Sequence, residues 1–225
     1  MPTSMPLSIT VTAGTTVSAI AMTPDDATCC LAFAPGAGGG INHAYTVAVC
    51  EGLAVRGMAT VRYQFPSIEN GSRRPDQPKL CHKTIQAAVA AAHELTPALA
   101  LFAGGKSFGG RMTSQIQAIE PLPHVRGLCF FGFPLHPPKR PATTRADHLS
   151  LVDIPMLFLQ GTRDELADLT LMQGVVARLN APVTFKVIEH ADHSFHVPVR
   201  TGMTDSEVMR SMLDDVATWA AAIVA

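Results

Sequence analysis

Short apolar runs alternate with helical patterns, and this alternation constrains the fold more than any other feature of the chain. The runs lie between about residue 28 and the C-terminus: CCLAFAP, ATVRYQF, ALALFAGG, GLCFFGF, PMLFLQG and TFKVIE. Runs as apolar as these are typical of strands that are buried on both faces of a sheet. Because strand and helix patterns alternate, we predict a mainly parallel, twisted sheet with helices on both faces.

Three further patterns predict elements around this sheet. LSITV and TVSAIAM alternate in polarity on either side of Gly14, which predicts an antiparallel hairpin at a sheet edge. Residues 84–95 carry an apolar stripe of helical period: Ile85, Ala88, Val89, Ala92 and Leu95. The last helix is expected to begin with a capping box of Thr204 and Glu207. Its apolar face is formed by Val208, Met212, Val216, Trp219 and Ile223.

Length and composition favour one globular domain over residues 1–225. Hydrophobic residues make up 47% of the chain and charged residues 16%, which is enough apolar material for a large core. The formal net charge of −1 gives no reason to expect a nucleic acid or an anionic membrane as a partner. No secretory signal and no membrane span are visible, so we expect a cytoplasmic protein.

The cysteines do not predict a disulfide framework. They are Cys29, Cys30, Cys50, Cys81 and Cys129, an odd number without regular spacing. We expect them to be reduced and mostly buried. No group of them has the spacing of zinc ligands, so no metal is expected.

Ligands of parallel α/β sheets bind at the carboxyl ends of the strands, so the chemistry should follow the apolar runs. Two long loops, 65–80 and 133–150, are rich in proline and charge. The second contains Pro134, Pro137, Pro138 and Pro141, which favour a stiff, extended path over a helical cap. We therefore predict no cap domain and a shallow, open cleft.

The stretch LFAGGKSFGGRM, residues 101–112, contains two overlapping motifs. A phosphate-binding P-loop requires G-x-x-x-x-G-K-[ST], but Ala100 stands where its first glycine should be. The residues that follow Ala100 are mostly apolar and belong to the predicted strand. The run GLCFFGF also lacks a terminal aspartate that could help to hold magnesium. The stretch is therefore not a P-loop.

The same stretch matches G-x-S-x-G, the sharp strand-to-helix turn that presents a nucleophilic serine. Gly105 and Gly109 flank Ser107 at the positions where strand and helix nearly touch, so both must be small. An apolar strand precedes the turn and a plausible helix follows it. The alternative is a glycine-rich turn whose serine merely caps the helix.

A nucleophilic serine needs a base, and the base needs an acid that orients it. Asp164 is the first acidic residue after PMLFLQG, and Glu165 and Asp168 are alternatives on the helix that follows. After TFKVIE the segment HADHSFH offers three histidines: His190, His193 and His196. Spacing alone leaves all three open, and each could instead brace a loop or lie on the surface.

Acyl transfer also needs N–H donors for the oxyanion. The backbone N–H of Phe108, next to the serine, is the first candidate. The glycine-rich loop APGAGGGINHAY supplies the second, for which we take Ala37, with its neighbour Gly38 as the rival. A dinucleotide-binding loop is excluded because Ile41 replaces the third glycine of G-x-G-x-x-G, and because no acidic residue closes ATVRYQF.

At this point the sequence resembles the α/β-hydrolase superfamily, and more narrowly the small lidless proteins similar to dienelactone hydrolase. The matching stretches are PGAGG, VRYQFP, NGSRRPD, GGKSFGGRM, FPLHPP, LFLQGTRDEL and ADHSF, in the family's order over nearly the whole chain. The resemblance implies Ser107 as nucleophile, Asp164 as acid and His193 as base. Two positions depart from it. Pro35-Gly36 stands where relatives often carry His-Gly, and Ser107 stands where the dienelactone hydrolases themselves have cysteine.

Together these patterns predict a serine hydrolase of a small carboxylic ester or thioester, with short acyl groups preferred. No cofactor is implied, and the expected oligomeric state is a monomer or a homodimer. The alternative function is a non-catalytic binding module on the same fold, since fold alone does not determine activity. Relatives that serve in complexes make this alternative concrete.

Overall fold

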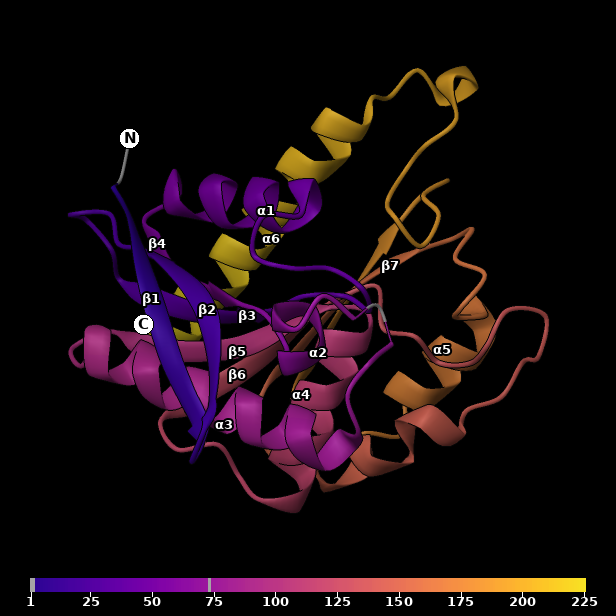
Figure 1. Cartoon of the computed structure of the whole chain (residues 1–225). Coiled ribbons are helices and arrows are strands. Elements are labelled where there is room, and N and C mark those ends of the chain that lie inside the picture. The colour runs from indigo at the N-terminus through magenta and orange to yellow at the C-terminus, as the bar shows by residue number, and fades with distance from the viewer. Residues whose placement is uncertain (1–2, 73) are drawn as a thin grey trace.

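The computed structural model describes residues 3–72 and 74–225. Its strands form one sheet in the order β1-β2-β4-β3-β5-β6-β7-β8 (Figure 1). The strands are β1 (Ser4–Thr12), β2 (Thr15–Met22), β3 (Cys29–Ala34), β4 (Met58–Tyr63), β5 (Ala100–Lys106), β6 (Val125–Phe131), β7 (Met156–Gly161) and β8 (Val183–Ile188). The β1–β2 and β2–β4 pairs are antiparallel, and all other pairs are parallel. The predicted parallel sheet with an N-terminal hairpin at its edge is confirmed.

Helices cover both faces of this sheet, as the alternation of patterns predicts. They are α1 (Ala44–Ala54), α2 (Pro66–Glu69), α3 (Pro78–Leu95), α4 (Phe108–Ile119), α5 (Leu169–Val176) and α6 (Asp205–Val224), with 3₁₀ turns η1 (Thr144–Leu151) and η2 (Val199–Thr201). α1 and α6 lie on one face, and α3 and α4 lie on the other (Figure 1).

The apolar runs are continuous because each strand contributes to two cores. Along β3, Cys30 and Ala32 pack in the core under α3 and α4, whereas Leu31 and Phe33 pack in the core under α1 and α6. Successive side chains of a strand point to opposite faces, so a strand covered on both sides needs apolar residues at every position.

One strand departs from this rule. The run TFKVIE predicts a strand buried on both faces, but β8 lies at one edge of the sheet and its residues are only half-buried, with Lys186 exposed. Lys186 Nζ lies 2.8 Å from Asp215 Oδ1 of α6. An exposed charge on an edge strand disfavours pairing with another chain, which accounts for a lysine within this run.

The predicted helix over 84–95 is longer than its apolar stripe. α3 begins at Pro78. Proline suits this position because the first N–H groups of a helix have no acceptor within the helix. The stripe residues Ile85, Ala88, Val89 and Ala92 are buried, but Leu95 is 38% exposed at the end of the helix. The predicted 65–80 loop is therefore shorter, since it also contains the helical turn α2.

α6 follows its prediction closely. The Thr204 hydroxyl and the Glu207 side chain form the reciprocal hydrogen bonds of a capping box. Val208, Met212, Val216 and Trp219 are buried, and Ile223 is half-buried near the C-terminus.

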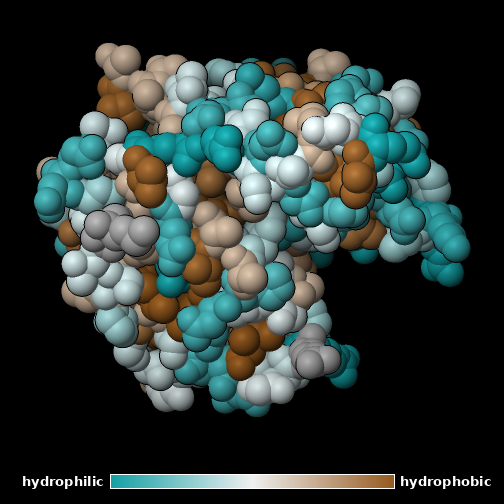
Figure 2. All heavy atoms as spheres, turned by 90° about the horizontal axis from the view of Figure 1, so that it is seen from above, coloured by the Kyte–Doolittle hydropathy of each residue, from teal (hydrophilic) through white to brown (hydrophobic). Residues whose placement is uncertain are grey.

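The face of the molecule seen from above mixes hydrophilic and hydrophobic side chains (Figure 2).

Three expectations about the whole chain can be compared with the structure. All five cysteines are free and buried, as predicted. Between β6 and β7 the chain forms only the turn η1, and no cap domain is present among the described residues. In residues 3–72 and 74–225, no helix combines the length and the apolar character needed to cross a membrane.

Candidate active site

The carboxyl ends of the parallel strands meet at one edge of the sheet, and the predicted site residues follow these ends. Ser107 comes directly after β5, Asp164 lies three residues after β7, and His193 lies five residues after β8. Ala37 follows β3 in the glycine-rich loop. The sheet thus gathers residues that are far apart in the sequence.

Ser107 occupies a strained turn between β5 and α4. Its backbone φ is +50° and ψ is −114°, a conformation that non-glycine residues rarely adopt. Although it is the residue that precedes the helix, its side chain makes no capping hydrogen bond. The hydroxyl is therefore available to another partner, in contrast to the helix-cap alternative. Strain of this kind is typical of functional sites.

The glycines of the turn are required by close approach. A side-chain carbon on Gly105 would overlap the backbone of Ala34, and one on Gly109 would overlap the backbone carbonyl of Pro35. Both contacts are with β3 and the loop that follows it. The turn therefore lets β5 and α4 pack directly against the glycine-rich loop, which brings that loop next to Ser107.

His193 connects the serine to the acid. Its Nε2 lies 2.8 Å from Ser107 Oγ, and its Nδ1 lies 2.7 Å from Asp164 Oδ2. Because an ionised carboxylate only accepts hydrogen bonds, Nδ1 carries the proton and Nε2 accepts from the serine hydroxyl. The Asp164 side chain is 1% exposed and that of His193 is 23% exposed. The arrangement can withdraw a proton from Ser107 while remaining open to a substrate.

Asp164 is held in place by two further donors. Gln160 Nε2 donates to its Oδ2 at 2.5 Å, and the Leu166 N–H donates to its Oδ1 at 2.8 Å. The alternative acids lie elsewhere: Glu165 is exposed, and Asp168 caps α5 by accepting from the Leu171 N–H at 2.9 Å. The Asp164 carboxylate hydrogen-bonds to the His193 ring, whereas the contact of Asp168 with a histidine is through its backbone N–H, which donates to His136 Nε2 at 2.8 Å.

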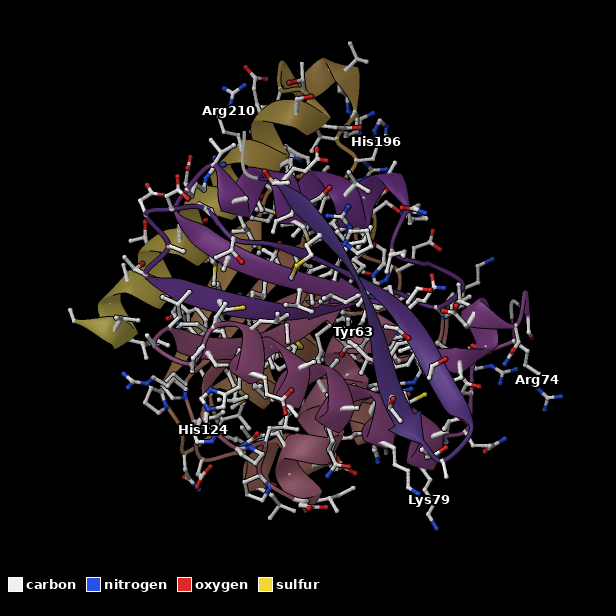
Figure 3. The ribbon with its side chains drawn as sticks, turned by 60° about the vertical axis from the view of Figure 1, so that its left-hand side comes forward. Tyr63, Arg74, Lys79, His124, His196 and Arg210 are labelled. Carbon is white, nitrogen blue, oxygen red and sulfur yellow. The ribbon has the colours of Figure 1, made fainter. Side chains whose placement is uncertain are left out.

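The other two histidines of HADHSFH have separate contacts. His190 is exposed, with φ of +62°, and its backbone N–H donates to Thr162 Oγ1 at 2.8 Å. His196 Nδ1 lies 2.8 Å from Asp205 Oδ2 at the start of α6, and Figure 3 shows His196 at the edge of the molecule. The Asp205 carboxylate raises the pKa of His196 by a direct hydrogen bond. Neither residue forms a hydrogen bond with Ser107.

The two predicted oxyanion donors border the same site. Phe108 is the first residue of α4, where helical N–H groups have no intrahelical acceptor. Ala37 is exposed and lines the same pockets as Ser107. In residues 3–72 and 74–225, neither backbone N–H donates to a backbone acceptor outside the regular elements. The rival Gly38 is also exposed, and it has φ of +74°.

Lys106, between Gly105 and Ser107, was not predicted as a site residue. Its Nζ donates to the backbone carbonyl of His193 and lies 4.8 Å from the ring centroid of Phe195 and 5.6 Å from that of Tyr45. Burial lowers the pKa of Lys106 to about 8, although Asp164 and Asp192 oppose this shift. The ammonium group thus contacts the loop that carries His193.

The cleft above Ser107 consists of two pockets that share Ala37, Ser107 and Leu166. The lysine pocket, of about 430 Å³, is bordered by the glycine-rich loop, Tyr45, Lys106 and His193. The arginine pocket, of about 280 Å³, is bordered by Phe108, Arg111, Arg145 and prolines of the 133–150 loop. Among the described residues, no cluster of histidine, cysteine or acidic side chains is arranged to hold a metal ion.

Comparison with known proteins agrees with the overall fold. The structure is similar to a dienelactone hydrolase from Anabaena variabilis, with a TM-score of 0.76 and 19% identity over 97% of this chain and 96% of that one. It is also similar to an esterase domain from Rhodothermus marinus, with a TM-score of 0.75 and 17% identity over 99% and 100% of the two chains.

A serine hydrolase without a lid from Xanthomonas campestris gives a TM-score of 0.73 and 19% identity, over 97% of this chain and 96% of that one. At these identities the likeness describes the fold alone. The sequence itself matches the alpha/beta hydrolase domain family over residues 27–221. Because this match covers most of the chain, the protein belongs to the α/β-hydrolase family.

Proposed function

We propose that this protein is a serine hydrolase that cleaves small carboxylic esters or thioesters through Ser107, His193 and Asp164. Family membership supports a hydrolase in general terms. The observation that carries the finer proposal is the continuous set of hydrogen bonds from Ser107 Oγ through the His193 ring to Asp164. A serine with this environment can be activated as a nucleophile, whereas an isolated serine hydroxyl cannot.

In the first half of the reaction, Ser107 Oγ attacks the carbonyl carbon of the ester while His193 Nε2 takes up its proton. Asp164 stabilises the resulting imidazolium and keeps the ring in the correct tautomer. The imidazolium then protonates the leaving alcohol or thiol. The products of this half are the free alcohol or thiol and an acyl group on Ser107.

The negative charge that develops on the carbonyl oxygen needs donors that are already in place. The N–H groups of Ala37 and Phe108 are free to serve, and the second lies at the N-terminus of α4, where the helix dipole also favours negative charge. In the second half, His193 removes a proton from water, which attacks the acyl group and releases the acid. Ser107 recovers its proton from His193.

The cleft favours small substrates. No cap domain covers it among the described residues, and Pro134, Pro137 and Pro138 give its outer wall a stiff backbone. A long acyl chain gains about 0.8 kcal/mol per CH₂ only when that carbon is enclosed. An open cleft provides little enclosure, which supports short acyl groups as substrates.

A fluorophosphonate probe tests the proposal, because it labels an activated serine and leaves a passive one unmodified. We expect wild-type protein to be labelled, Ser107→Ala to be unlabelled, and His193→Ala to be labelled far more slowly. Ser150→Ala, at an exposed serine of η1 outside the cleft, is the matched control and should be labelled like wild type. Folded wild-type protein that resists the probe would instead indicate a binding module.

A further inference from the structure

The arginine pocket differs from an ordinary apolar acyl site in its charge. Arg111 on α4 and Arg145 on η1 both border it, together with Ser107. Among the described residues that line this pocket there is no aspartate or glutamate. Nor does any ion pair within residues 3–72 and 74–225 involve either arginine. Both arginines therefore border the same pocket as Ser107, and no carboxylate of the described residues forms an ion pair with either of them.

Arg111 is the more strongly affected of the two. Its Nε is buried and has no hydrogen-bond partner among the described residues. Burial lowers the pKa of Arg111, and the positive charge of Arg145 lowers it further. The guanidinium does face the Phe108 ring, whose centroid lies 5.9 Å from the guanidinium carbon. A buried donor without an acceptor costs free energy, and a buried charge without a counterion costs more.

The neighbouring titratable groups do not supply the missing negative charge. Burial lowers the pKa of His148 to about 4, so this ring is neutral, and its Nε2 lies 2.7 Å from Ser114 Oγ. Burial also lowers the pKa of His82. Burial raises the pKa of the Cys81 thiol to about 12, so the thiol keeps its proton. Asp147 is exposed and borders a different pocket.

We propose that the arginine pocket binds an anionic group of the substrate, a carboxylate or a phosphate, next to the ester that Ser107 attacks. This inference rests on the proposed function, and it narrows the substrate class to small anionic esters or thioesters. Planar guanidinium groups match the oxygens of carboxylate and phosphate with paired hydrogen bonds. An anion bound between the two arginines would offset the repulsion of their like charges.

Matched substrates test the inference. We would compare 4-acetoxybenzoate with its neutral methyl ester, and the mono-p-nitrophenyl ester of glutarate with the corresponding methyl diester. These pairs place the anion on the alcohol side and on the acyl side, respectively. A third substrate, 4-acetoxyphenyl phosphate, distinguishes phosphate from carboxylate. Ser107→Ala protein provides the background rate. We expect wild-type kcat/KM to favour the anionic member of at least one pair by about tenfold or more.

Arginine variants show whether this preference arises in the proposed pocket. Arg111→Met and Arg145→Met should each lower the ratio of anionic to neutral kcat/KM, by about tenfold for Arg111. Arg145→Lys should give a ratio between those of Arg145→Met and wild type, because lysine keeps the positive charge but lacks the planar guanidinium that makes paired hydrogen bonds. Arg140→Met is the matched control, an exposed arginine of the same loop that does not line the pocket, and its ratio should equal that of wild type.

Binding to Ser107→Ala protein separates failure of this inference from failure of the proposed function. Calorimetric titration with 4-acetoxybenzoate should give binding that Arg111→Met weakens in the same background. If wild type hydrolyses no ester but this binding is found, the proposed function fails and the anion site stands. Equal rates for charged and neutral esters, or ratios that neither arginine variant changes, would overturn the inference.

Discussion

The two pockets beside Ser107 each contain cationic side chains, but these cations have different partners. On one side, Lys106 donates to the His193 carbonyl and lies over the rings of Tyr45 and Phe195. On the other side, Arg111 has a buried Nε for which the described residues offer no partner, and a second arginine is its neighbour. A buried cation whose partners belong to the protein holds neighbouring groups in position. One whose partners are missing is suited to bind a ligand.

The largest effect is expected from removing Ser107, which borders both pockets, or its hydrogen-bond partner His193. Ser107→Ala and His193→Ala should each lower kcat on neutral and anionic esters alike, by a factor on the order of 10⁴–10⁶. The double variant should be hardly slower than either single variant, because the two residues act as one unit. Steady-state rates on both ester classes check this. Additive losses would show that the serine and the histidine act independently.

The next effect concerns the acid that orients His193. Asp164→Asn keeps the shape of the side chain but offers an amide to Nδ1, which favours the wrong tautomer of the ring. We expect kcat to fall by about 10³–10⁴, less than for Ser107→Ala. Asp168→Asn changes only the cap of α5 and is the matched control. A loss for Asp164→Asn as small as that of the control would exclude the acid role.

Lys106 should influence activity through the position of His193. Lys106→Met keeps the length of the side chain but removes the donor to the His193 carbonyl, so kcat on both ester classes should fall by about 10²-fold at most. Lys83→Met, at an exposed position of α3, is the control. A change in the anionic-to-neutral ratio for Lys106→Met would contradict the claim that Lys106 positions His193 while the arginine pocket selects anionic substrates.

The pH dependence sharpens this prediction. The pKa of Lys106 is about 8, below its ordinary value, so the ammonium loses its proton as the pH rises through 8. The neutral amine keeps N–H donors but loses the charge that strengthens the bond to the His193 carbonyl. Wild-type kcat/KM should therefore fall part of the way toward that of Lys106→Met. Burial of the charged form costs stability below this pH, and the cost is relieved above it. The free energy of unfolding should therefore change in the opposite direction to activity, as denaturant titrations at several pH values can show.

The smallest expected effect is that of acyl chain length. The part of the chain that the structure describes forms no cap domain over either pocket, so p-nitrophenyl acetate and butyrate should be hydrolysed faster than the octanoate and palmitate. Each added CH₂ should contribute well below the ~0.8 kcal/mol of full enclosure. Turnover of the four esters measures this. A specificity that rises steadily to palmitate would reveal an apolar tunnel, for which the 65–80 segment is the nearest candidate.

The sequence alone determined those features that depend on local pattern. The continuous apolar runs predicted strands covered on both faces, and Gly105 and Gly109 predicted a tight strand-to-helix turn at Ser107. That both glycines are needed for close approach to Ala34 and Pro35 was visible only in the structure. The capping box of α6 was also readable from four consecutive residues. Each of these depends on steric or hydrogen-bonding requirements within one short segment, which neighbouring elements do not change.

Other features depended on which segments become neighbours, and only the tertiary structure decided them. Spacing left His190, His193 and His196 open as the base, and the resemblance implied His193. In the structure His193 Nε2 lies 2.8 Å from Ser107 Oγ, whereas His196 hydrogen-bonds to Asp205. The exposure of β8 follows from its place at the end of the strand order. Gln160 could have been noticed as the one polar residue in a buried run, but its contact with Asp164 requires the fold.

The charges beside Ser107 illustrate the same limit most clearly. Lys106 adjoins the serine in sequence, but its partners Tyr45 and Phe195 lie far from it in the sequence, one before it and one after it. Arg111 and Arg145 belong to separate elements and border one pocket only after η1 packs against α4. Whether a charge is satisfied depends on burial and on all groups within a few ångströms. These are properties of the packed structure, and the local sequence does not determine them.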